Sequence, residues 1–165
     1  MGELAVSARS GDELAAIGLG SCIGLALVDR EAGVAGLAHV VLPDSLGKPG
    51  PPAKFADLAV PELIKQMEKA GAIQRRLQAI LVGGGRMFAA GATMDVGARN
   101  HEAVREALAQ ARIPIRAEAT GGNRGRTARV IVGGDISAQV AGAGRDVLLN
   151  MAKSRRCGAR TGAPA

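Results

Sequence analysis

Residues 18–42 read GLGSCIGLALVDREAGVAGLAHVVL, and this stretch decides the fold. Two apolar runs, 23–28 and 33–42, flank the polar break Asp29-Arg30-Glu31-Ala32. Apolar runs of this length on either side of a turn-rich break predict a β-hairpin of two buried strands. Gly18 and Gly20 predict a tight turn that leads into the first strand.

The register of this hairpin places two reactive side chains. If Leu27 pairs with Val34, Cys22 lies directly opposite His39 and both side chains point to one face of the sheet. A free thiol with a pKa of about 8.5 is only about 3% thiolate at pH 7, and a neighbouring imidazolium stabilises the thiolate and lowers that pKa. The pair predicts a cysteine nucleophile with a histidine acid and base. The alternative is a buried core cysteine beside a hydrogen-bonded core histidine.

Patterns outside the hairpin predict further elements. We expect strands over 77–82, 113–119, 128–132 and 136–140. An apolar stripe predicts a helix from Pro61 to Gly71, with an earlier start near Leu58 and a kink at Pro61 as the alternative. Asn100 is the expected N-cap of a second helix, and residues 147–152 are expected to form a short third one. This order favours an α+β fold, a layered α/β sandwich with mixed, largely antiparallel sheets, two to three helices and a Cys-His hydrolase-like site.

Length and composition exclude several classes of protein. A chain of 165 residues predicts one domain, and 24 glycines without a Gly-X-Y period exclude collagen. No apolar run is long enough for a membrane helix, and the first residues lack the pattern of a secretory signal. Two cysteines cannot build a disulfide framework, and their spacing from the two histidines does not suit zinc. We expect a cytoplasmic protein without a metal, a cofactor or membrane insertion.

The formal net charge of +6 is concentrated at the end of the chain. Residues 153–165 contain Lys153, Arg155, Arg156 and Arg160 and no acidic residue, which predicts a flexible basic tail after a single domain over 1–152. Contact of the tail with a polyanion is the alternative. With Phe55 and Phe88 as its only aromatic residues, the chain offers few platforms for base stacking, so we expect no nucleic-acid partner.

Six motifs resemble those of the CheD family of chemoreceptor glutamine deamidases. They are GLGSC (18–22), AHVVLPDS (38–45), KFAD (54–57), GGGRMF (83–88), VGARN (96–100) and TGGNRGR (120–126), in family order. The resemblance implies hydrolysis of selected glutamine side-chain amides on methyl-accepting chemotaxis receptors, giving glutamate and ammonia. It implies that Cys22 is the nucleophile and His39 the general acid and base. The amides around Gly20 and Ser21 are the expected oxyanion hole.

One position departs from the family pattern. Family members commonly carry a catalytic threonine six residues before the cysteine, where this chain has Ala16. Either Ser21 or Thr120 replaces it, or the role is dispensable, or activity is reduced. A weakened member could instead serve as a regulatory binding module for a CheC-type phosphatase, which is the alternative function.

A basic segment runs over 112–129 and includes Arg124 and Arg126. One interpretation is a solvated face. The other is a docking surface for acidic receptor helices, with Arg124 and Arg126 as the contact residues.

Overall fold

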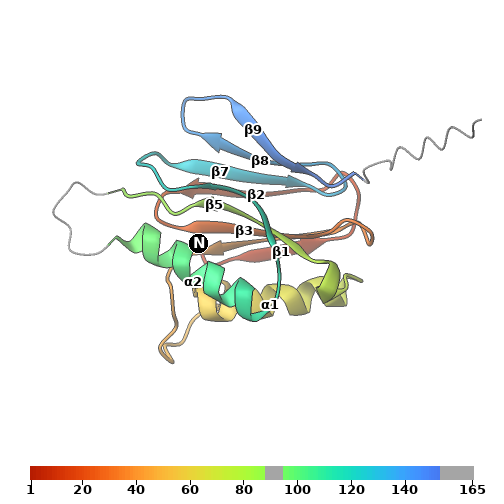
Figure 1. The fold of residues 1–165 in the computed structure, drawn as a ribbon, viewed down its shortest axis with the longest axis horizontal. Coiled ribbons are helices and arrows are strands. Elements are labelled where there is room, and N and C mark those ends of the chain that lie inside the picture. Colours follow the sequence, from red (N-terminus) through yellow and green to blue (C-terminus); the bar gives the residue numbers. More distant parts are fainter. Residues whose placement is uncertain (88–94, 153–165) are drawn as a thin grey trace, which may run out of the picture.

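The computed structural model describes residues 1–87 and 95–152. The predicted basic tail, residues 153–165, and the last residue of the 83–88 motif lie outside the described residues. The described chain forms three layers: two helices, a five-stranded sheet and a four-stranded sheet (Figure 1). The fold class is therefore the predicted α+β sandwich.

The two sheets differ in how their strands pair. The first has the order β1-β4-β3-β5-β6, in which only β5 and β6 are parallel, and the second has the antiparallel order β2-β7-β8-β9. The strands of the first sheet are β1 (Leu4–Ser7), β3 (Ile23–Asp29), β4 (Val34–Val40), β5 (Gln78–Gly83) and β6 (Ile115–Thr120). Those of the second are β2 (Glu13–Leu19), β7 (Arg126–Ile131), β8 (Asp135–Val140) and β9 (Arg145–Asn150).

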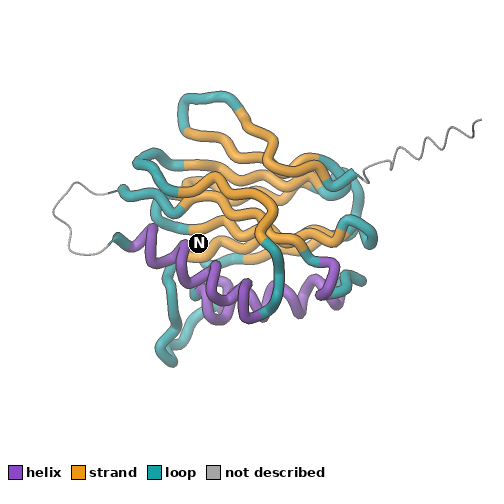
Figure 2. Tube along the Cα trace, in the orientation of Figure 1, coloured by secondary structure: helices purple, strands orange, loops and turns teal. Residues whose placement is uncertain are grey.

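Both α-helices, α1 (Ala56–Lys69) and α2 (Val96–Gln110), cover the same face of the first sheet (Figure 2). Short 3₁₀ turns over Pro52–Lys54 and Gln74–Arg76 flank α1. No helix in 1–87 or 95–152 is long and apolar enough to span a membrane.

Strand β3 is buried along its whole length because both of its faces are covered. Leu25 and Leu27 belong to the core under the helices, whereas Ala26 and Val28 belong to the core between the sheets. This double burial explains why the strand reads as a continuous apolar run without alternation. On β4, a side chain at Gly36 would collide with the packed helix side chains, so this glycine serves close packing.

The predicted hairpin register is wrong by two residues. Leu27 pairs with Gly36, and His39 pairs with Gly24. The reason is that Asp29 ends β3 and its carboxylate accepts hydrogen bonds from the amides of residues 31 and 32, at 3.0 Å each, which fixes a four-residue turn. A shift of two residues preserves the face on which each side chain lies, so His39 still points with Leu37 toward the second sheet, into whose core Cys22 packs.

Three other predictions about elements change. Helix α1 begins before Pro61, which confirms the earlier start, and Asn100 lies inside α2. The N-cap of α2 is Asp95, whose carboxylate accepts from the amide of Ala98 at 3.0 Å. The predicted helix over 147–152 is wrong, because Arg145–Asn150 forms strand β9 against β8.

The start of the chain also differs from expectation. Residues 4–7 and 13–19 form strands that the sequence pattern did not indicate, and the expected turn at 18 begins only after β2 ends at Leu19.

Candidate active site

A pair of glycine amides holds the turn that carries Cys22. The Gly85 amide donates to the Gly20 carbonyl at 2.8 Å, and the Gly84 amide donates to the Cys22 carbonyl at 2.8 Å. Gly83 has a φ of +110°, and a Cβ there would lie 2.2 Å from the Cys22 oxygen. This approach is open only to a residue without a side chain.

A second glycine loop joins the first. The Gly121 amide donates to the Gly83 carbonyl at 2.9 Å, and the Arg86 amide donates to the Gly122 carbonyl at 2.7 Å. The three glycine-rich segments of the sequence, 18–20, 83–85 and 121–122, therefore meet around the cysteine turn.

Asn100 supplies the third support of this turn. Its side chain is fully buried, and its Nδ2 donates to the Ser21 carbonyl and to the Val41 carbonyl, each at 2.9 Å. The carbonyls of residues 20, 21 and 22 are thus all engaged.

Two amide hydrogens of the turn remain available. The Gly20 amide donates to the Gly18 carbonyl at 3.0 Å, whereas within 1–87 and 95–152 neither the Ser21 amide nor the Cys22 amide donates to a backbone carbonyl. The Cys22 amide faces its own sulfur, where it favours the thiolate. Ser21 and Cys22 are therefore the better donors for an oxyanion, and the predicted Gly20 amide is already engaged.

Cys22 and His39 are both neutral near pH 7 in this arrangement. Only 8% of Cys22 is exposed, and burial raises the pKa of its thiol. Burial lowers the pKa of His39, the N-terminal ammonium lowers it further, and Glu3 opposes this shift. The pKa of Cys22 thus moves in the direction opposite to the sequence-based prediction, because the imidazole carries no charge and burial disfavours the thiolate.

Among the described residues, His39 Nε2 is buried and has no hydrogen-bond partner. The backbone around the histidine is nevertheless fixed, since the His39 amide donates to the Glu3 carbonyl at 2.9 Å and its carbonyl accepts from the Gly2 amide. Catalytic hydrogen bonds are often absent before substrate binds, so this geometry suits a site that tightens around its substrate.

His39 lines a pocket of about 660 Å³ at the edge between the two sheets. Ala16 on β2 lines the same pocket, as do Glu3, Glu13 and Ile17. The position where the family resemblance expects threonine therefore opens into the space beside His39, and its methyl group offers no hydrogen bond.

The two expected substitutes for that threonine do not line this pocket. Thr120 ends β6 and lines a different pocket, together with Arg86 and His101. Ser21 lies in the cysteine turn, and its hydroxyl makes no hydrogen bond within the described ranges.

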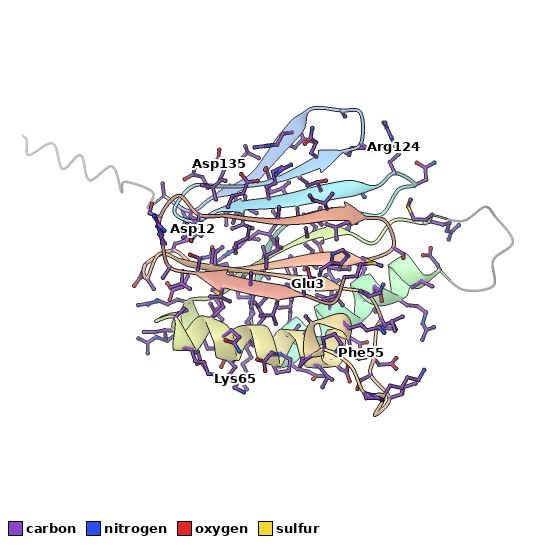
Figure 3. All side chains as sticks on the ribbon, turned by 180° about the vertical axis from the view of Figure 1, so that it is seen from behind. Glu3, Asp12, Phe55, Lys65, Arg124 and Asp135 are labelled. Atoms are coloured by element: carbon purple, nitrogen blue, oxygen red, sulfur yellow. The ribbon has the colours of Figure 1, made fainter. Side chains whose placement is uncertain are left out.

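The two arginines predicted to dock the receptor lie at one end of the second sheet. Arg124 is exposed, projects away from the helices (Figure 3) and donates to the Ala141 carbonyl. Arg126 is half-buried and donates to the Gly121 carbonyl at 2.5 Å, so it also supports the site loop. No group of three or more potential metal ligands occurs in the part of the chain that the structure describes.

Asn100 is the residue that sequence reasoning misplaced. Its residue type predicts a helix cap, yet Asn100, Val104 and Leu108 recur at intervals of four on the buried face of α2. A polar residue in such a stripe was the available signal of a buried amide with specific partners.

Comparison with known proteins identifies the family. A model of the CheD family, described as CheD chemotactic sensory transduction, matches residues 41–136. A protein of Clostridium novyi (strain NT) is 48% identical over 120 residues, which cover 70% of this chain and 74% of the relative. One of Clostridium kluyveri is 48% identical over 126 residues, covering 73% and 78%, and one of Clostridium botulinum (strain Alaska E43) is 51% identical over 116 residues, covering 67% and 72%. Each is named a probable chemoreceptor glutamine deamidase CheD. The resemblance carried by the six motifs is confirmed, and the chain belongs to the CheD family.

Proposed function

We propose that this chain is a cytoplasmic chemoreceptor glutamine deamidase, with residues 1–152 as its catalytic domain. It hydrolyses glutamine side-chain amides on methyl-accepting chemotaxis receptors to glutamate and ammonia. Similarity to the named relatives supports the substrate class. The observation that carries the chemistry is a shared face: Cys22 packs into the core between the sheets, and His39 alternates with Leu37 onto that same face.

The first half of the reaction forms a thioester. His39 accepts the proton of the Cys22 thiol as the sulfur attacks the carboxamide carbon, so the thiolate forms only during attack. The amide oxygen becomes an oxyanion, which the Ser21 and Cys22 amides stabilise. His39 then donates its proton to the amide nitrogen, the C–N bond breaks, and ammonia leaves.

The second half restores the enzyme. Water attacks the thioester carbon while His39 accepts a proton, and the C–S bond breaks to give the carboxylic acid. The sulfur leaves as a thiol with the proton from His39. The sum is one amide and one water converted to one acid and one ammonia, and no cofactor takes part.

The test is mass spectrometry of a chemoreceptor co-expressed with this chain. We expect receptor glutamines to show the mass increase of amide-to-acid conversion and purified protein to release ammonia. Cys22→Ala should abolish both, whereas Cys157→Ala, the same chemical change at the other cysteine, should leave both intact. An unmodified receptor with the wild-type protein would overturn the proposal.

A regulatory role is the second candidate, favoured by Ala16 in the pocket of His39. In this case the chain binds a CheC-type phosphatase and contributes little hydrolysis. Pull-down with such a phosphatase, performed alongside the ammonia assay, separates the two functions. Binding without ammonia release favours the module, and ammonia release without binding favours the enzyme alone.

Receptor docking through Arg124 is a further part of the proposal. The exposed guanidinium should steer association with acidic receptor helices, an effect that salt screens. Rising salt should therefore slow receptor deamidation more than hydrolysis of a small neutral amide, and Arg124→Ala should reduce that difference. Equal salt responses of the two substrates would contradict docking by charge.

A further inference from the structure

Asn100 links the two segments that carry the proposed catalytic pair. Its Nδ2 uses one hydrogen for the Ser21 carbonyl, directly before Cys22, and the other for the Val41 carbonyl, two residues after His39. Both distances are 2.9 Å, and no part of Asn100 is exposed. A single side chain from α2 therefore bridges the cysteine turn and the end of β4.

The bond to Ser21 sets the direction of the Cys22 amide. The Ser21 carbonyl and the Cys22 N–H belong to one planar trans peptide, so they point in opposite directions. Asn100 lies on α2, which covers one face of the first sheet, whereas the Cys22 side chain packs on the other face. With its carbonyl held toward α2, this peptide presents the Cys22 N–H on the side of the thiol.

Helix α2 reaches this close to the turn because of Gly97. A Cβ at Gly97 would lie 2.4 Å from the Gly85 oxygen and 2.7 Å from the Gly84 oxygen. The first turn of α2 thus packs directly on the backbone of the glycine loop. That contact brings residue 100, one turn later, into reach of the Ser21 carbonyl.

Asparagine at position 100 is unfavourable for stability in one respect, which indicates a specific role for this residue. Its Oδ1 is buried and has no partner among the described residues. A buried acceptor without a hydrogen bond is unfavourable, and an aliphatic residue would continue the stripe of Val104 and Leu108 without that cost. The two donors of the amide are what asparagine supplies at this position.

We infer that Asn100 is a positioning residue of the active site. It holds the Ser21–Cys22 peptide so that the Cys22 amide faces the oxygen that becomes negative during attack, and it ties this turn to the His39 strand. The inference rests on the proposed deamidase function.

The test compares Asn100→Ala with Val104→Ala in receptor deamidation. Val104 is fully buried one turn later on the same face of α2, so its truncation is the matched control for lost packing. Loss of an oriented oxyanion donor lowers kcat by about 100-fold or more, so we expect that fall in Asn100→Ala with KM within about twofold of wild type. Val104→Ala should unfold at a lower temperature but keep its kcat where it is folded.

Asn100→Ser, with one hydroxyl donor, provides a second variant if the alanine variant does not fold, and we expect an intermediate kcat. Wild-type kcat in a folded Asn100 variant, or a fall no larger than in Val104→Ala, would overturn the inference while leaving the deamidase function standing. An inactive wild-type protein would instead overturn the proposed function, and this inference with it.

Discussion

The protonation state of Cys22 can be measured by its rate of alkylation with iodoacetamide, because only the thiolate reacts. Burial raises the pKa of Cys22 above its ordinary value and lowers that of His39. An ordinary thiol with a pKa of about 8.5 is only about 3% ionised at pH 7, so Cys22 is less ionised still. Raising the pH from 7 to 9 should then increase the alkylation rate by about 25-fold or more.

The raised pKa of Cys22 and the lowered pKa of His39 also determine how catalysis depends on pH. Attack requires a neutral imidazole. Because the pKa of His39 is lowered, the pH at which half of the molecules have a neutral imidazole lies below about 6.5. Activity should therefore rise as the pH increases through that lowered value and persist into the neutral range. A chain in which an imidazolium–thiolate pair was required would instead lose activity as His39 deprotonates.

The alkylation assay is cleanest in a Cys157→Ser background, which leaves a single thiol. His39→Ala should change the pH profile of alkylation little, because the imidazole is neutral over most of the range, yet it should abolish deamidation. An alkylation rate that stays constant from pH 6 to 9 and collapses in His39→Ala would refute a neutral pair and show a preformed thiolate.

Three further predictions follow from single residues. Gly83→Ala should displace the Cys22 carbonyl, because its Cβ would lie 2.2 Å away at a φ of +110°. Thermal unfolding should show a loss of stability of about 1–3 kcal/mol, and most of the deamidation rate should be lost as well. Burial alone would raise the pKa of the Asp29 carboxyl, but hydrogen bonds from Arg76 and from backbone amides hold that pKa below its usual range. Asp29→Asn should cost about 3 kcal/mol at pH 7. This difference in urea unfolding should begin to shrink as the pH falls below about 4, where the carboxylate of the unfolded chain takes up a proton, and should disappear once the pH passes the lowered pKa of the folded carboxyl. Ala16→Thr, which adds a hydroxyl to the pocket of His39, should raise kcat by up to about tenfold if the bond forms, whereas an unchanged kcat would show that this site works without a third group.

The hairpin illustrates what sequence alone can and cannot predict. Its two strands and the shared face of Cys22 and His39 followed from apolar runs. The face was predicted correctly despite the error in register, because a shift of two residues keeps each side chain on the same face of a strand. The register itself depended on the Asp29 carboxylate, which also reaches the Ile73 amide at 2.9 Å. The bonds to residues 31 and 32 that fix the turn are local, whereas the bond to Ile73 joins residues 44 apart in sequence, and no local pattern reveals it.

In the site, too, local patterns predicted some features, whereas others depended on contacts between distant segments. The glycine motifs and the reactive pair were visible as residue types at a given spacing, whereas the pKa directions depended on burial, which is a property of the assembled layers. The bond from Asn100 to Ser21 spans 79 residues, and only the packing of α2 on the glycine loop creates it. Residue 100 looked like a cap because asparagine is common there, and the buried stripe of α2 outweighed that propensity.

The glycine content bears directly on how the catalysis works. Gly83 and Gly97 occupy positions where a Cβ would strike a backbone oxygen at 2.2 Å and 2.4 Å, so at both positions glycine permits close contact of rigid segments. Such contacts fix the carbonyls of the cysteine turn and leave the Ser21 and Cys22 amides without a backbone acceptor in the described part of the chain. A neutral, buried thiol gains little from its own reactivity, so the barrier must be lowered chiefly where charge develops on the amide oxygen. In the proposed mechanism the backbone of this site therefore lowers the barrier more than the pKa of Cys22 does, and substitutions that move Gly83 or Asn100 should lower kcat even when Cys22 alkylates normally.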